Sequence, residues 1–346
     1  MENITCYAYP NSKVVAKIHS NPYLDNQINA ISHYCDVVNR NKKTTKGLFD
    51  LFSYHSKTKA FIFNWIEDLP GKRFWQIQLL LLFYVVFLNK IFRNKKIVWV
   101  LHNKISHQKD KSFFRKIIFD LMLKNSTQII THSTEGVRFV ADKCKTAKHK
   151  THFIHHPIDG NVRTHKQEKK YDLIIWGTVK PYKGVHDFLK ALKDQNKQDD
   201  FKILIAGKFS GEDYLNEVKS HAGKQVEIID DFLEFDELES LIDRSKIILF
   251  TYSENSVLSS GSLMDSLLSP SLIVGPNIGA FADLAKENIV KTYDSLNELP
   301  NLLNVYIKES SDKNMIEARK VFIKENSWKN FGEFFKNMVN NNIKKN

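Results

Sequence analysis

The sequence predicts an α/β protein built from two doubly wound parallel sheets. Short runs of Ile, Leu and Val alternate with helical stretches along most of the chain. Strands separated by helices pair in parallel, and continuous apolar runs are typical of strands covered on both faces. At ~100–200 residues per domain, 346 residues suffice for two domains, each with its own core.

In each half of the chain, five apolar runs are expected to form strands and four intervening stretches to form helices. In the first half the strands are residues 4–8, 60–64, 97–101, 127–131 and 152–155, and the helices are 25–34, 73–92, 111–124 and 134–143. In the second half the strands are residues 172–176, 202–206, 226–229, 246–250 and 272–274, and the helices are 185–193, 212–221, 236–244 and 260–268.

A polar stretch at residues 160–170 separates the two halves and is interpreted as a linker. The expected domains are therefore residues 1–160 and 171–324. Near the C-terminus, Trp328, Phe331, Phe334 and Phe335 are spaced for one amphipathic helix. We expect this helix, at residues 325–340, to pack back on the first domain.

Composition and charge narrow the class of protein. Apolar residues make up 42% of the chain, which excludes an intrinsically disordered protein. The three cysteines, Cys6, Cys35 and Cys144, form no CxxC pair, which argues for a reducing compartment and against a zinc site. The N-terminus has no signal-peptide pattern. The longest apolar run, residues 79–88, is short of the ~18–20 residues that cross a bilayer, so a buried or interfacial helix is expected.

In doubly wound sheets, ligands bind beyond the carboxyl ends of the strands. The segment from Gly177 to Gly184 follows such an end, with Lys180 and Lys183 as cations before an expected helix. Two cations near a helix start suit a diphosphate. An ordinary turn with solvated lysines is the alternative. The segment is neither a Walker loop nor a GxGxxG motif.

A second segment of this kind joins a strand to a helix at residues 252–265. Its serines and glycine can hold phosphate oxygens, and Asp265 can accept hydrogen bonds from ribose hydroxyls. The alternative is a serine-rich helix cap followed by a surface aspartate. The candidate donor-binding residues are Gly177, Lys180, Lys183, Asp231, Ser259, Ser260, Gly261, Ser262 and Asp265.

These two segments together resemble the donor-binding half of GT-B fold glycosyltransferases of the family 4 type. The resemblance extends to the bacterial exopolysaccharide subgroup that includes xanthan-type mannosyltransferases. It rests on Gly177, Lys180 and Lys183, and on the turn Ser260-Gly261-Ser262 leading to a helix with Asp265. It implies a GT-B fold and binding of a nucleoside diphosphate sugar as co-substrate.

The first half resembles the acceptor domain of the same family. The resemblance rests on Asn21 and Tyr23 near the start, His102 and Asn103 after one strand, and His132 after the next. It implies that these residues lie on the acceptor side. Neutral His102 can take a proton from the attacking hydroxyl, although a structural histidine is the alternative.

The chain departs from the family pattern at its glutamates. Family 4 has two glutamates separated by seven residues, whereas here the later position is Asp265 and the earlier one has no glutamate. Glu254 is then the candidate for the earlier role, either stabilising charge at the anomeric carbon or accepting the proton. Asp68 is a third candidate base.

The resulting hypothesis is a cytoplasmic, metal-independent hexosyltransferase on the inner face of the cell membrane. It moves a sugar from a UDP- or GDP-sugar to a lipid-linked glycan in surface polysaccharide synthesis. The net charge of +12 suits an anionic membrane, and no nucleic-acid motif is present. Basic residues flank the apolar helix: Lys72, Arg73, Lys90, Arg93, Lys95 and Lys96. The alternatives are a nucleotide-sugar 2-epimerase and a non-enzymatic protein that binds nucleic acid or membrane.

Overall fold

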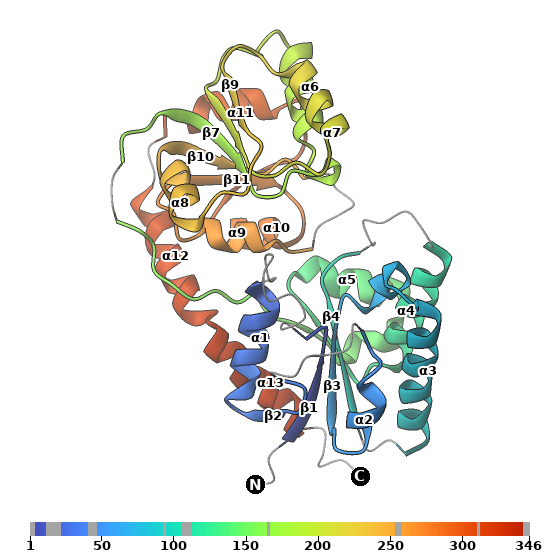
Figure 1. The fold of residues 1–346 in the computed structure, drawn as a ribbon. Coiled ribbons are helices and arrows are strands. Elements are labelled where there is room, and N and C mark those ends of the chain that lie inside the picture. Colours follow the sequence, from blue (N-terminus) through green and yellow to red (C-terminus); the bar gives the residue numbers. More distant parts are fainter. Residues whose placement is uncertain are drawn as a thin grey trace. The chain divides into compact units, whose positions relative to one another are not determined.

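The computed structural model describes residues 4–11, 22–40, 47–92, 95–104, 112–164, 167–252, 258–309 and 312–341. The chain forms two compact units, which are described separately (Figure 1). Unit 1 comprises residues 1–157 and 326–346, and unit 2 comprises residues 158–325. The chain therefore passes between the units twice, after Pro157 and after Glu325.

Unit 1 contains a six-stranded parallel sheet in the order β2-β1-β3-β4-β5-β6. Its strands are β1 (Ile4–Tyr9), β2 (Cys35–Val37), β3 (Ala60–Asn64), β4 (Lys96–Leu101), β5 (Gln128–Thr131) and β6 (Thr151–Phe153). The chain order reverses between β1 and β3, and such a switch point is where doubly wound sheets bind ligands.

Helices cover both faces of this sheet. They are α1 (Pro22–Ser32), α2 (Leu51–His55), α3 (Trp75–Phe92), α4 (Ser112–Asn125), α5 (Thr134–Lys143) and α13 (Trp328–Asn341). Helices α1 and α13 lie on one face and α2, α3 and α4 on the other (Figure 1). Trp328, Phe331 and Phe335 of α13 join the core formed by α1 and the sheet. The C-terminal helix thus packs on unit 1.

Unit 2 contains a second six-stranded parallel sheet, in the order β12-β11-β10-β7-β8-β9. Its strands are β7 (Tyr171–Trp176), β8 (Ile203–Ala206), β9 (Val226–Ile229), β10 (Ser245–Leu249), β11 (Leu272–Pro276) and β12 (Lys291–Tyr293). Its switch point lies between β7 and β10, so the loops after these two strands are where a ligand is expected.

In the described part of unit 2, helices pack on this sheet in two layers. They are α6 (Val185–Asp194), α7 (Glu212–His221), α8 (Phe235–Asp243), α9 (Gly261–Ser266), α10 (Gly279–Lys286), α11 (Leu299–Tyr306) and α12 (Lys313–Glu325). Helices α6, α7 and α11 share one core cluster with the sheet. Helices α8, α9 and α10 share the other. The apolar side chains of every central strand are therefore covered on both sides.

Two expectations about chain organisation were wrong. The polar stretch 160–170 is not a free linker, since Val162 is buried in unit 2 and Arg163 forms ion pairs with Asp243 and Glu239. The helix expected at 260–268 is shorter, Gly261–Ser266. Strands β2 and β12, of three residues each, were not predicted.

Candidate active site

The loop after β7 is shaped around a glycine and a buried lysine. Gly177 has φ 88°, which favours glycine, and Gly184 at φ 67° turns the chain into α6. Between them, a 3₁₀ turn at Pro181–Lys183 carries the Lys183 side chain back to the sheet, where Nζ donates to the carbonyl oxygen of Trp176 at 3.2 Å. The predicted turn and helix start are confirmed.

Lys183 is buried, with a relative exposure of 6%, whereas Lys180 is exposed. Burial, followed by the charge of Lys180, lowers the pKa of Lys183 to about 8. Within the described part of the chain, its ammonium donates one hydrogen bond, although it carries three N–H groups. A buried cation with donors to spare is suited to bind an anion.

Helix α9 meets this lysine from a distant part of the sequence. Ser260 caps the helix, with its Oγ accepting from the N–H of Leu263, and it also bonds the hydroxyl of Tyr252 at 3.0 Å. A Cβ atom added at Gly177 would lie 3.1 Å from Lys183 Nζ and 3.3 Å from Ser262 Oγ. Lys183 Nζ and Ser262 Oγ therefore both lie beside Gly177, and a side chain at position 177 would crowd them.

The remaining predicted donor residues are placed less closely. Asp265 is exposed on α9, one turn beyond Gly261. The hydroxyl of Ser259 is buried with no partner among the described residues. Asp231 is exposed after β9, two strands from β7, and accepts from the N–H of Phe232. Glu254 lies outside the described residues. Their roles stay predictions.

In unit 1, four rings gather beyond the sheet's carboxyl edge, named here the imidazole cluster: Tyr23, His102 and His132, which are buried, and His156, which is half-buried. His102 follows β4 directly, as predicted. The Trp65 ring stacks on it with centroids 4.0 Å apart, and Tyr23 meets it edge-on at 4.8 Å. Asn103 is half-buried beside it, and Asn21 lies outside the described residues.

Hydrogen bonds fix the proton position on His102. Asn64 Nδ2 donates to Gln27 Oε1 at 2.8 Å, so Asn64 Oδ1 is left to accept from His102 Nε2 at 3.0 Å. Burial, together with the neighbouring His132 and His156, holds the pKa of His102 well below 6.5. The neutral ring therefore carries its proton on Nε2, and Nδ1 keeps a lone pair that can accept a proton.

The tautomer of His132 is determined in the same way. Its Nδ1 lies 2.9 Å from the carbonyl oxygen of Ile154, which can only accept, so Nδ1 carries the proton. Nε2 then accepts from the Tyr23 hydroxyl at 2.8 Å. Burial lowers the pKa of His132 to about 3 and that of His156 to about 4. The cluster is thus neutral at pH 7.

The third candidate base is engaged elsewhere. Asp68 forms an ion pair with Arg115, so its carboxylate is held by a guanidinium. The adjacent Glu67 is buried, and burial raises its pKa to about 7. Neither belongs to the imidazole cluster, which leaves His102 as the described residue best placed to act as a base.

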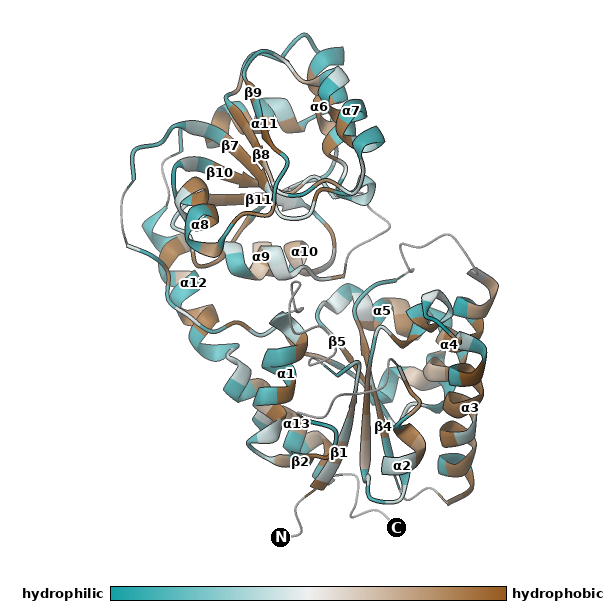
Figure 2. Cartoon of the chain, viewed as in Figure 1, coloured by the Kyte–Doolittle hydropathy of each residue, from teal (hydrophilic) through white to brown (hydrophobic). Residues whose placement is uncertain are grey.

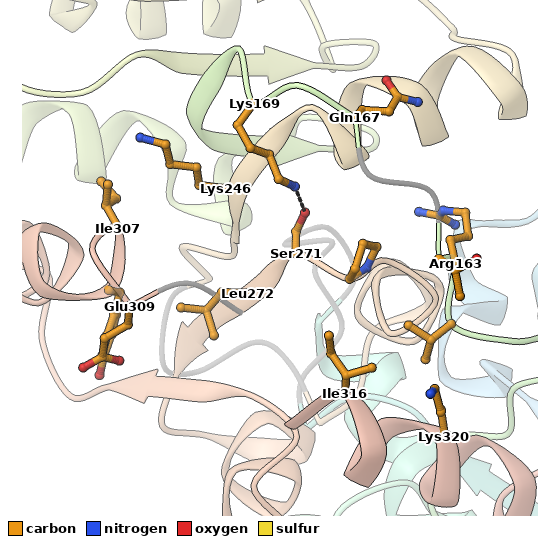
Figure 3. Close-up of a pocket in the computed structure, with 14 residues that line it drawn as sticks. Arg163, Gln167, Lys169, Lys246, Ser271, Leu272, Ile307, Glu309, Ile316 and Lys320 are labelled. Atoms are coloured by element: carbon orange, nitrogen blue, oxygen red, sulfur yellow. Dashed lines mark hydrogen bonds between the residues drawn. The ribbon is translucent and has the colours of Figure 1, made fainter. Parts of the chain in front are cut away.

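A cavity of about 530 Å³ lies at the opposite edge of the unit 2 sheet, where β10 and β11 begin. Lys169 lines it, but its Nζ donates to Asp243 O, Ser245 O and Ser271 Oγ, and Figure 3 shows it directed at Ser271. Because all three donors are occupied, this lysine ties strand ends together and offers nothing to a ligand.

A known family model matches the part of the chain that carries the loop after β7. Residues 161–256, which include Gly177 and Lys183, match the family described as Glycosyl transferases group 1. A search of curated proteins finds no match to the chain.

Solved structures share the fold over the full length. Anabaena Alr3699/HepE in complex with UDP and glucose is 11% identical, with a TM-score of 0.67 over 98% of this chain and 100% of that one. A Rickettsia africae glycosyltransferase is 14% identical, with a TM-score of 0.67 over 100% of both. TarM is 12% identical at a TM-score of 0.62; the match covers 84% of this chain but only 57% of TarM. The chain thus has the GT-B fold of these structures, and residues 161–256 match the Glycosyl transferases group 1 family.

Proposed function

We propose that the protein transfers a sugar from a UDP- or GDP-sugar to a hydroxyl of a lipid-linked glycan. The observation that carries the proposal is the proximity of Gly177, Ser262 and the buried Lys183 ammonium, which makes one hydrogen bond to the residues that the structure describes. A diphosphate is the expected ligand because its negative charge balances the positive charge of the Lys183 ammonium. The complex of HepE with UDP, in a protein of the same fold, supports this donor class.

In the proposed reaction, the acceptor oxygen forms a bond with the anomeric carbon while the bond from that carbon to the diphosphate oxygen breaks. The electron pair leaves with the diphosphate. Lys183 stabilises the growing negative charge, and the hydroxyl of Ser262 donates to the same group. Since Lys183 is withdrawn from water, its interaction with the leaving group is stronger than that of a surface lysine.

The proton of the acceptor hydroxyl goes to Nδ1 of His102. Asn64 holds the proton of the ring on Nε2, so Nδ1 is available at neutral pH without a prior deprotonation. The stacked ring of Trp65 restricts rotation of the imidazole. Asn103 and Tyr23 are proposed to lie on the acceptor side, as the family resemblance implies.

Three finer features belong to the same proposal. We assign the enzyme to surface polysaccharide synthesis at the inner face of the cell membrane, in agreement with its net charge of +12. We retain the resemblance to the xanthan-type subgroup as a prediction about the sugar. Activity is expected without a metal ion because Lys183 supplies a cation for the leaving group, so EDTA is expected to leave the rate unchanged.

The test measures ligand binding and turnover separately. Thermal stabilisation by UDP, GDP, uridine and guanosine identifies the base and shows whether the diphosphate is needed. We expect a diphosphate of one base to raise Tm and its nucleoside to have little effect. Incubation with the matching nucleotide sugars, with and without glycan acceptor, then shows whether the sugar is transferred to the acceptor.

Two outcomes would contradict the proposal. Equal stabilisation by a nucleoside and its diphosphate would show that Lys183 and Ser262 do not bind phosphate. Conversion of the nucleotide sugar to an epimer without any acceptor would favour the epimerase alternative instead.

A further inference from the structure

Helix α3 of unit 1 exposes apolar side chains on its outer face, where a surface helix usually has polar ones. Its outer face is apolar, with side chains between 37% and 68% exposed. This outer face comprises Ile77, Leu80, Phe83, Tyr84, Phe87, Ile91 and Phe92. Figure 2 shows the helix hydrophobic along its length. A helix that keeps apolar side chains in contact with water over ~27 Å, at ~1.5 Å per residue, needs a partner.

Two of the three amide side chains of α3 face the protein instead, whereas Gln76 is exposed. Gln78 is buried, with Oε1 accepting from the N–H of Leu48 and Nε2 donating to the carbonyl of Arg73. Asn89 is buried as well and accepts from the N–H of Lys95. These bonds fix the roll of the helix, so the apolar stripe cannot turn inward. Leu82, Val85 and Val86 complete the inner side.

Neighbouring elements extend the apolar surface. Phe52 of α2 is 67% exposed, and its ring lies 6.1 Å from that of Tyr84. Trp75 packs on Phe114 of α4, which in turn contacts the exposed Phe113. The surface is therefore broader than one helix and continuous, and α2, α3 and α4 all lie on this side of the sheet (Figure 1).

Cations border the surface at both ends of the helix. Lys72 and Arg73 are exposed before its start and Lys90 near its end, while α3 contains no Asp or Glu. Lys95, expected to share this role, is instead tied to the carbonyls of His55 and Thr58. Arg93 lies outside the described residues.

We propose that this surface docks on an anionic lipid bilayer, with α3 lying in the plane of the interface. By length and composition, α3 is long and apolar enough to cross a membrane, and 33% of it is buried within the described structure. The buried Gln78 and Asn89 bind it to unit 1, which favours lying on the bilayer over crossing it.

The positions of the cations favour a lipid bilayer over a second copy of the chain as the partner of this surface. Two copies packed face to face along α3, in either direction, would bring the cations at the helix ends of one copy close to those of the other. Anionic headgroups instead neutralise the cations while the apolar stripe enters the acyl boundary. This docking does not depend on the sugar chemistry.

The test is flotation of the full-length protein with vesicles of phosphatidylcholine, alone or with phosphatidylglycerol added. We expect binding that requires the anionic lipid and weakens with salt. Leu80→Gln/Phe87→Gln/Ile91→Gln is expected to lower the vesicle partition constant at least about tenfold, since each large apolar side chain no longer leaves water. Lys72→Glu/Lys90→Glu is expected to remove the preference for phosphatidylglycerol.

Matched controls come from unit 2. Phe235→Gln/Val305→Gln/Val321→Gln changes three side chains of similar exposure, and Lys190→Glu/Lys193→Glu reverses two exposed cations. Both are expected to bind vesicles like the wild type. The proposal is overturned if the wild type ignores anionic vesicles, or if the α3 triple variant binds as well as its control. A dimer in sedimentation that only the triple variant disrupts, without vesicle binding, would assign the surface to a second copy.

Discussion

Lys183→Met is expected to make the free protein more stable while removing its response to a nucleoside diphosphate. In the folded state, burial and Lys180 lower the pKa of Lys183 from 10.5 to about 8. At ~1.36 kcal/mol per pH unit, keeping this ammonium charged at pH 7 costs the fold about 3 kcal/mol. Methionine fills a similar volume but leaves the carbonyl of Trp176 without its donor, at a cost of about 1 kcal/mol.

The free energy of unfolding is therefore expected to be about 2 kcal/mol higher for the variant than for the wild type. For a unit of this size, that corresponds to a rise in Tm of roughly 4–8 °C. The pH dependence has a definite sign. Because the folded-state pKa is lowered, the destabilisation by Lys183 is fully present below about pH 8 and disappears as the pH rises towards 10.5. The difference between variant and wild type is therefore expected to shrink over that range.

Differential scanning fluorimetry from pH 7 to pH 10, with and without UDP or GDP, measures both effects. Loss of the charged donor is expected to weaken diphosphate binding by about 10- to 100-fold. Lys180→Met, at an exposed position, is the control and is expected to change stability by less than about 0.5 kcal/mol. A Lys183→Met protein that melts below the wild type at pH 7, or that keeps the full nucleotide response, would refute the reasoning.

Three further predictions address the glycine, the base and the buried histidines. Gly177→Ala places a methyl group 3.1 Å from Lys183 Nζ on a backbone with φ 88°, and it is expected to weaken donor binding at least about tenfold. The control is Gly211→Ala, whose added Cβ has open space around it. Its donor affinity, measured by calorimetry, is expected to equal that of the wild type. Asn64→Asp keeps the tautomer of His102 and is expected to raise its pKa, which moves the acid limb of the pH–rate profile to higher pH. Asn64→Leu is expected to lower kcat at every pH. An acid limb that does not move in Asn64→Asp would contradict the assignment of His102 as the base. The pKa values of His132 and His156 are lowered from 6.5 to about 3 and about 4, so the unfolded chain binds protons at a higher pH than the folded one. The free energy of unfolding is therefore expected to fall by about 4 kcal/mol between pH 7 and pH 5. Urea unfolding checks this, and the fall is expected to be about half as large in His156→Phe.

Much of the fold follows from local sequence. The central strands end within two residues of the expected positions because each is a continuous apolar run. The error at residues 160–170 has a different origin. Arg163 forms ion pairs with Asp243 and Glu239, which lie far along the chain. These contacts leave no local signal in the sequence, so the packed segment has the polar composition of a linker.

The candidate donor site could be predicted from sequence because its residues follow the rule that ligands bind beyond strand ends. Gly177 and Ser262 come after β7 and β10, at the switch point of the sheet. Asn64 was missed although it ends β3, so the same rule applied to it. Gln27 gave no such signal, since a glutamine on an amphipathic helix is usually solvated and its bond to Asn64 depends on tertiary packing.

Within the described part of unit 2, Lys183 makes fewer hydrogen bonds than two other cations that are withdrawn from water, Arg319 and Lys169. Buried Arg319 donates to the carbonyls of Ile289, Ser269 and Ser271, and Lys169 has three acceptors. Lys183 has one, and His102 uses only Nε2. A fold gains nothing from a buried cation with donors to spare, because desolvation is then poorly offset. A ligand that accepts the remaining hydrogen bonds would offset this cost, and the ligand we propose for Lys183 is therefore an anion.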